Sequence, residues 1–95
     1  MTLYRRRELV DAFQWDGREK IDNTPEWFRN AIRNKEVWFG YKKFYVGEEA
    51  QFVIFIGLVD DLYRTVRVND YIMYDSGQIY GFPPNIFNEM YIQVE

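Results

Sequence analysis

The last third of the chain, residues 66–94, constrains the fold more than any other segment. Two runs of β-prone residues, 70–73 and 78–80, flank the turn-forming sequence Asp-Ser-Gly at 75–77. Short β-prone runs on either side of such a turn are typical of a hairpin. We therefore predict two antiparallel strands here, with almost no loop between them.

The segment after this hairpin begins with a proline pair. Pro83 and Pro84 cannot continue a strand in the middle of a sheet. A short helix is predicted over about 85–90, where Asn85 can act as a cap by accepting bonds from free backbone amides. Residues 91–94 are predicted to return as an edge strand.

A longer amphipathic helix is predicted over about 25–34. Thr24 suits the capping position before it, and Pro25 suits the first helical position. A strand is predicted before this helix, at 9–15. Four apolar residues share one face of the helix and are expected to face a sheet: Trp27, Phe28, Ala31 and Ile32.

The middle of the chain is rich in strand signals. Strands are predicted at 37–39 and 43–46, with a bend at 40–42 between them. The most hydrophobic run, 51–58, is expected to be a central buried strand. A further strand is predicted at 62–68, after an Asp-Asp turn.

These elements together predict a small antiparallel α+β domain. We expect one sheet of about five to seven strands, a packed helix over about 25–34 and a short C-terminal helix over about 85–90. Ninety-five residues suffice for one modest hydrophobic core. A single domain spanning 1–95 is therefore expected.

The chain has no histidine and no cysteine. Thiol chemistry, cysteine zinc sites and histidine general bases are therefore excluded. The carboxylate pairs at 48–49 and 60–61 lie where solvated turns are expected, and Ser76 has no histidine to activate it. We predict no catalytic residue, no metal site and no cofactor, although hydrolysis by carboxylates is a weaker alternative.

Charge and aromatic content point toward binding. The formal net charge of −3 argues against a duplex DNA partner, and no apolar run is long enough to cross a membrane. A basic run at 5–7 could bind phosphate, although a solvated entry to the first strand is the favoured explanation. Aromatic residues make up 20% of the chain, which is more than a small core readily hides.

Aromatic and cationic residues alternate in two stretches of the middle region. These stretches contain Trp38, Tyr41, Lys42, Lys43, Tyr45, Tyr63, Arg64 and Arg67, and all of them except Lys42 are candidate binding residues. Such residues provide hot spots in protein interfaces, and they also stack on nucleobases and pair with phosphates. An amphipathic hairpin with one face in the core is the simpler explanation of the same pattern.

Two separated pieces of the chain resemble a family of small uncharacterised proteins of bacteriophages and prophages. The N-terminal motif, Val-x-Ala-Phe-Gln-Trp-x-Gly, is matched by Val10, Ala12, Phe13, Gln14, Trp15 and Gly17. The C-terminal motif is matched by Asp70, Tyr71, Ile72, Gly77, Tyr80, Pro84, Ile86, Phe87 and Tyr91. Asn69 stands in place of the family's turn glycine, and Phe82 in place of its cysteine.

This resemblance implies a phage or prophage accessory protein that works in the host cytoplasm and carries no catalytic residues. We expect it to act by binding. Its partner is either a host or defence protein or a small nucleotide signal held in an aromatic and basic pocket. The excess of aromatic rings also predicts a homodimer that forms through the sheet face or edge containing part of the 38–46 segment.

Overall fold

The computed structural model of the protein describes residues 10–91, which form six strands and two helices. In chain order the elements are β1 (Asp11–Gln14), α1 (Glu26–Arg33), β2 (Val37–Lys42), β3 (Gln51–Gly57), β4 (Tyr63–Val66), β5 (Tyr71–Asp75), β6 (Gln78–Phe82) and α2 (Pro84–Met90). The class is α+β with antiparallel pairing, as predicted. The strands form two sheets, ordered β1-β5-β6 and β2-β3-β4.

The prediction of a single sheet is therefore wrong. The physical reason is that one short helix cannot cover the apolar face of so wide a sheet. A sheet of six strands spaced by about 4.8 Å is about 24 Å wide. An eight-residue helix is only about 12 Å long, so α1 alone cannot cover such a sheet. Two three-stranded sheets instead face each other and bury each other's inner side chains.

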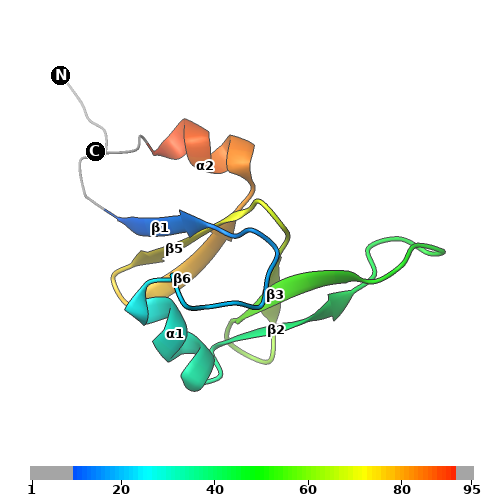
Figure 1. Cartoon of the computed structure of the whole chain (residues 1–95), viewed down its shortest axis with the longest axis horizontal. Coiled ribbons are helices and arrows are strands. Elements are labelled where there is room, and N and C mark those ends of the chain that lie inside the picture. Colours follow the sequence, from blue (N-terminus) through cyan, green and yellow to red (C-terminus); the bar gives the residue numbers. More distant parts are fainter. Residues whose placement is uncertain (1–9, 92–95) are drawn as a thin grey trace.

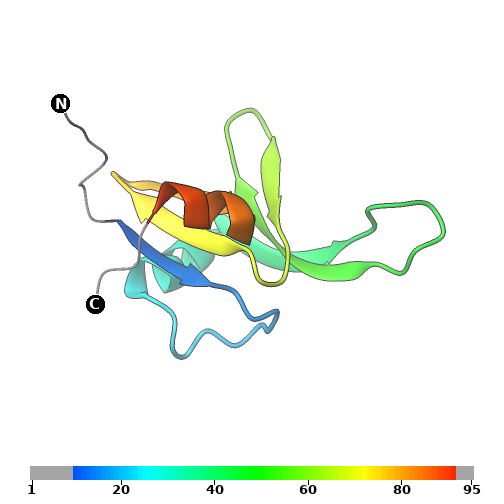
Figure 2. The same ribbon diagram turned by 90° about the horizontal axis from the view of Figure 1, so that it is seen from above.

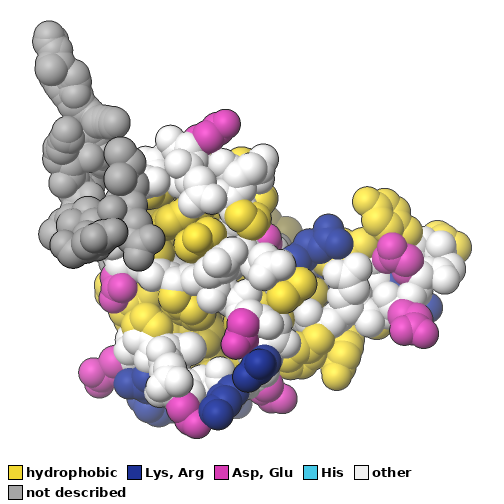
Figure 3. All heavy atoms as spheres, turned by 45° about the horizontal axis from the view of Figure 1, so that its top comes forward, with side chains coloured by type: hydrophobic (Ala, Val, Ile, Leu, Met, Phe, Trp, Pro, Cys, Tyr) yellow, Lys and Arg dark blue, Asp and Glu magenta, His cyan; other side chains and the backbone are white. Residues whose placement is uncertain are grey.

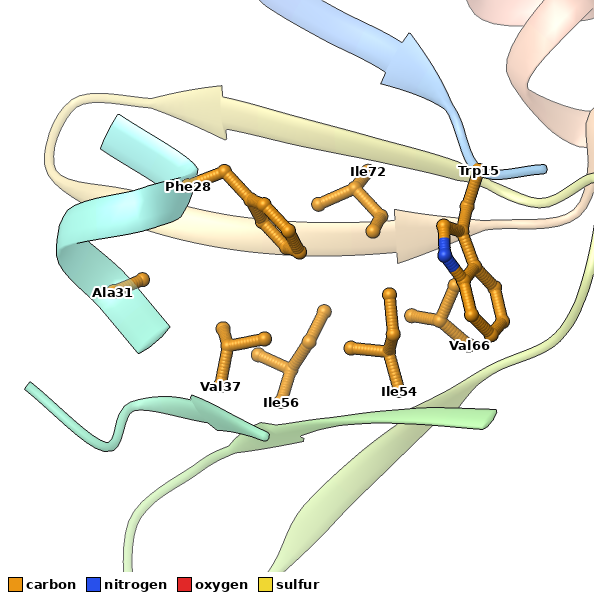
Figure 4. Close-up of a cluster of buried hydrophobic side chains, with 8 residues drawn as sticks. All are labelled: Trp15, Phe28, Ala31, Val37, Ile54, Ile56, Val66 and Ile72. Atoms are coloured by element: carbon orange, nitrogen blue, oxygen red, sulfur yellow. The ribbon is translucent and has the colours of Figure 1, made fainter. Parts of the chain in front are cut away.

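The hydrophobic core lies between the two sheets (Figure 4). Ile54 and Ile56 of β3 enter it from one sheet, and Ile72 of β5 enters it from the other. Phe28 of α1 fills the side of the core, and Trp15 closes its opposite end. All five are almost completely buried, so the core depends on residues from both halves of the sequence.

The N-terminal and C-terminal motif segments lie side by side in this fold. β1 pairs with β5 in antiparallel register, with Phe13 opposite Ile72. Beyond β1, the Trp15 N–H donates to the Asp70 carbonyl (2.9 Å), and the Asn69 N–H donates to the Trp15 carbonyl (2.8 Å). Asn69 has φ +77°, the left-handed conformation predicted for this turn. These motif residues therefore build the core and its edges.

Helix α1 differs from its prediction in how it begins. Its cap position is Pro25, and the hydroxyl of Thr24 donates to the Ile21 carbonyl instead of capping the helix (2.6 Å). Its buried residues are Phe28 and Ala31. The other two residues of the predicted face, Trp27 and Ile32, are only partly buried at the margin of the core.

Strand β2 corrects the prediction for residues 37–46. It runs without a bend through 40–42, and residues 43–50 form the loop to β3 in place of the predicted strand at 43–46. The C-terminal end of β2, the N-terminal end of β3 and the loop between them project from the body of the molecule as an arm (Figures 1 and 2). The central position predicted for the strand at 51–58 is confirmed, because β3 lies between β2 and β4.

The C-terminal part follows the predicted hairpin. β5 and β6 pair around the turn at 75–77, and α2 begins directly at Pro84. Asn85 therefore lies inside α2 and does not cap it. Tyr91 belongs to no strand. The rest of the predicted edge strand, 92–94, and the basic run at 5–7 lie outside the described residues.

Candidate binding surface

The outer face of the sheet β2-β3-β4 follows from the alternation of side chains along its strands. Val37, Ile54 and Ile56 point into the core, so their neighbours along the strands point away from it. The register places Trp38 of β2 opposite Phe55 of β3 on this outer face. Neither helix covers it, since α1 lies at the side of the core and α2 lies over the other sheet (Figure 1).

A layer of aromatic and cationic side chains extends across this outer face. We call it the aromatic–cationic face, and it comprises Trp38, Lys42, Phe44, Phe55, Tyr63 and Arg67. All three strands or their immediate extensions contribute to it. Figure 3 shows a different view, in which hydrophobic side chains and acidic groups gather on the projecting arm.

The aromatic rings of this face contact one another directly. Trp38 stacks on Phe55 with centroids 5.8 Å apart, and Tyr63 meets the edge of Phe55 at 5.0 Å. Two glycines make room for these rings, because a Cβ at Gly40 would lie 2.7 Å from the Phe55 ring and one at Gly57 3.3 Å from Trp38. The sequence thus places glycine where a ring crosses the neighbouring strand.

Two cations extend the ring cluster toward the arm. The Lys42 ammonium lies 5.2 Å from the centroid of Tyr63, and the Arg67 guanidinium lies 4.3 Å from the centroid of Phe44. Both distances are within the range of cation–π attraction. Arg67 also donates to the side-chain oxygen of Gln51 (3.4 Å). The cations are therefore held against the face.

The structure brings together only some of the predicted binding residues. Trp38, Tyr63 and Arg67 share the aromatic–cationic face with Lys42. Tyr41 and Arg64 belong to the opposite parity of their strands and point to the inner side of the sheet. Lys43 and Tyr45 lie in the loop 43–50.

Lys42, Phe44 and Phe55 were not among the predicted binding residues. Phe55 lies in the most hydrophobic run, whose composition indicated only burial. The pairing register assigns Phe55 to the outer face, because Val53, Phe55 and Gly57 alternate with the core residues of β3. The alternation could have been found in the sequence, whereas the pairing with Trp38 could not.

The carboxylates of the described residues form no cluster of the kind that holds a metal ion. No group of three or more acidic residues suited to a metal ion occurs within residues 10–91. Asp70 is partly buried, and this burial raises the pKa of its carboxyl, against the opposing effects of a hydrogen bond from the Arg67 N–H and of the Arg67 charge. Its Oδ2 atom accepts that bond at 2.9 Å, which fixes the turn before β5.

A cavity of about 620 Å³ lies at another part of the molecule. Its lining residues are Lys35, Glu36, Val37, Ile56, Gly57, Leu58, Val59, Gly77, Gln78 and Ile79. It opens between the start of β2, the end of β3 and the turn between β5 and β6. None of the six side chains of the aromatic–cationic face lines it.

Within residues 10–91, no helix is both long enough and apolar enough to span a bilayer. No protein-family model, curated protein or solved structure matches the chain. The class of this protein is therefore defined by its fold as a small antiparallel α+β domain. The likeness to phage proteins rests on the motif residues alone.

Proposed function

We propose that this chain is a phage or prophage accessory protein that acts by binding and captures a protein of the host cytoplasm on its aromatic–cationic face. The observation that carries the proposal is the uncovered layer of rings and two cations across three neighbouring strands. Trp38 and Tyr63 are 41% and 47% exposed. Partly exposed Trp, Tyr and Arg side chains of this kind provide most of the binding energy in protein interfaces.

The arrangement of the rings favours a protein partner over a nucleotide. Neighbouring centroids on the face lie 5.0 to 6.5 Å apart, which is the separation of rings in direct contact. A nucleobase therefore has no slot between two rings and could only lie on top of them. A broad, closely packed cluster is better suited to the apolar centre of a protein interface, where water is excluded over a wide area.

The charges on the face define the chemistry of the partner. Lys42 and Arg67 lie beside the ring cluster. Charge pairs at an interface raise association rates and select among partners. We therefore propose a partner that presents an apolar patch with acidic residues near its edge.

A quantitative capture experiment tests this function. Tagged wild-type chain and the variants Tyr63→Ala and Tyr80→Ala are incubated with host extract, and bound proteins are quantified by mass spectrometry. Tyr80 is the matched control because it is 38% exposed, stacks on a neighbouring ring and lies on β6. We expect Tyr63→Ala to weaken the affinity for the captured protein by about tenfold or more, and Tyr80→Ala to leave it unchanged.

Native mass spectrometry of the purified chain tests the alternative that the face binds a small nucleotide. A small ligand that co-purifies with wild-type protein and is lost in Tyr63→Ala would contradict the proposed protein partner. Equal capture of the same host protein by both variants would contradict the proposed face.

A further inference from the structure

Strand β2 forms one edge of its sheet and offers free backbone groups there. The Gly57 N–H donates to the Glu36 carbonyl at 2.8 Å, so the backbone of Glu36 faces β3. Backbone groups alternate in direction along an antiparallel strand. The backbones of Trp38, Gly40 and Lys42 therefore face β3 as well, and those at 37, 39 and 41 face away from it.

The outward-facing half of this backbone has no protein partner within the described part of the chain. Besides the ladders within the sheets, no backbone hydrogen bond engages residues 37, 39 or 41. α1 contacts β2 and lies next to its start, whereas the second half of β2 runs along the lower margin of the molecule in Figure 1. β2 also contains no proline, and its register with β3 is uninterrupted. Proline and bulges that interrupt the register are two common ways of protecting an edge strand, and β2 has neither.

The sequence of β2 is complementary to itself when two copies run antiparallel. With a two-fold axis at Gly40, Trp38 of one copy lies opposite Lys42 of the other, and Phe39 lies opposite Tyr41. The first pair combines a cation with an indole on the outer face. The second pairs two aromatic rings on the inner face, where Tyr41 is 69% exposed.

The hydrogen-bonding directions agree with this axis. Phe39 and Tyr41 both present their N–H and C=O groups away from β3, so two copies can exchange both bonds between these residues. Gly40 then meets Gly40 of the second copy at a position without hydrogen bonds, where side chains approach most closely. Glycine provides the space that this close approach needs.

We propose that a second copy of this chain pairs with the free edge of β2, with the two-fold axis at Gly40, to form one continuous six-stranded sheet. The pairing joins the two aromatic–cationic faces into a single surface on the same side of the sheet. In each copy, β4 remains the outer edge strand of the combined sheet. The assembly goes beyond the proposed capture of a host protein and does not depend on it.

The mass of the full-length chain in solution tests the pairing. Light scattering coupled to size exclusion, from micromolar to millimolar concentration, should give twice the 11.6 kDa of one chain. Tyr41→Pro removes an N–H that faces away from β3 and should halve the mass, since the β2–β3 ladder keeps all its bonds. Tyr41→Ala is the matched control, which loses the ring, keeps the N–H and should stay a dimer.

Two outcomes would overturn the proposal. One is a wild-type monomer over the whole concentration range. The other is a Tyr41→Pro dimer whose circular dichroism and urea unfolding match those of the wild type. If Tyr41→Pro fails to fold, disulfide cross-linking tests the pairing without a proline.

Disulfide cross-linking tests the axis itself, and the chain has no native cysteine. The double variant Trp38→Cys/Lys42→Cys places cysteines opposite each other across the proposed interface, at the spacing of a disulfide. Within one chain these positions are about 13 Å apart along the strand and cannot bond to each other. We expect a covalent dimer after mild oxidation.

The matched control is Glu36→Cys/Lys42→Cys, which would cross-link only if the axis lay at Phe39. We expect no covalent dimer from this variant. Cross-linking of the control in place of the first variant would overturn the axis at Gly40. Absence of cross-linking in both, with a monomeric wild type, would overturn the pairing altogether.

Discussion

The two sheets differ in how their outer faces are covered. On the sheet β1-β5-β6 the outer residue Met73 is buried, and Tyr71 stacks on Phe87 of α2 with centroids 4.2 Å apart. On the sheet β2-β3-β4 the outer rings Trp38 and Tyr63 stay exposed, and no helix lies over them within residues 10–91. The chain provides a helix over part of one outer face, where Tyr80 is still 38% exposed, and no helix over the other, where Val53 is nonetheless completely buried.

This difference indicates where to look for function in a chain for which the sequence predicts no catalytic residue. An aromatic face that a helix covers contributes to stability, since its rings are removed from water. An aromatic face left open gains that energy only when a partner covers it. The following substitutions test whether stability and binding separate between the two regions in this way.

The largest expected loss of stability is in the core between the two sheets. Phe28→Ala should lower the free energy of unfolding by about 3–5 kcal/mol, because it leaves a cavity between the sheets. Trp38→Ala removes a larger ring from the open face and should cost less than about 1.5 kcal/mol, within the range of an exposed aromatic contact. Urea unfolding of both variants gives the two values. Equal losses would mean that the open face stabilises the fold as the core does.

Two glycines, Gly81 beside the core and Gly40 on the open face, provide a second comparison of the two regions. A Cβ at Gly81 would lie 2.7 Å from a methyl group of Val66, which is completely buried and has no space to move. Gly81→Ala should therefore lower the free energy of unfolding by about 1–3 kcal/mol. A Cβ at Gly40 meets the Phe55 ring at the same distance, but this ring lies on the open face and can shift. Gly40→Ala should cost less than Gly81→Ala in the same urea titration.

Asn69→Gly should change stability by less than about 1 kcal/mol. Glycine adopts the left-handed conformation of Asn69 without strain. The hydrogen bonds described for Asn69 all use its backbone, toward Trp15 and the side chain of Gln14. Thermal unfolding of the variant provides the measurement. A larger loss would reveal a specific role for the Asn69 side chain.

The smallest expected effect is the pH dependence that Asp70 causes. Burial raises the pKa of this carboxyl in the folded state, so the folded chain binds its proton more tightly than the unfolded chain. The stability of the wild type relative to Asp70→Asn should therefore fall as the pH rises from the ordinary pKa of aspartate through the raised one. The amide oxygen of the variant can still accept the bond from the Arg67 N–H. A relative stability that rises across this window would contradict the assignment.

The sequence predicted local structure well and long-range pairing poorly. The turn at 75–77 and the helix around residues 26–33 each depend on neighbours in the chain, and both are present. The division into two sheets depends on β1 pairing with β5, whose residues are about sixty positions apart. Nothing in a strand's own alternation selects such a partner.

The candidate site shows the same limit. Trp38, Tyr63 and Arg67 were predicted from their residue types, and the structure places them on one face. Tyr41 was predicted with them, although it points to the opposite side of β2. The predicted bend at 40–42 hid this alternation, because parity can be followed only along an uninterrupted strand.

The central claim is that the open face of β2-β3-β4 is where a partner binds, and radical footprinting of the full-length chain tests it most directly. The oxidation of each tyrosine is measured with and without host extract. Tyr63 lies on β4, the edge opposite the proposed dimer contact, so self-association leaves it unaffected. We predict that host extract protects Tyr63 and leaves Tyr74 and Tyr80 of the other sheet unchanged. Protection of Tyr74 or Tyr80 with Tyr63 still oxidised would contradict the account.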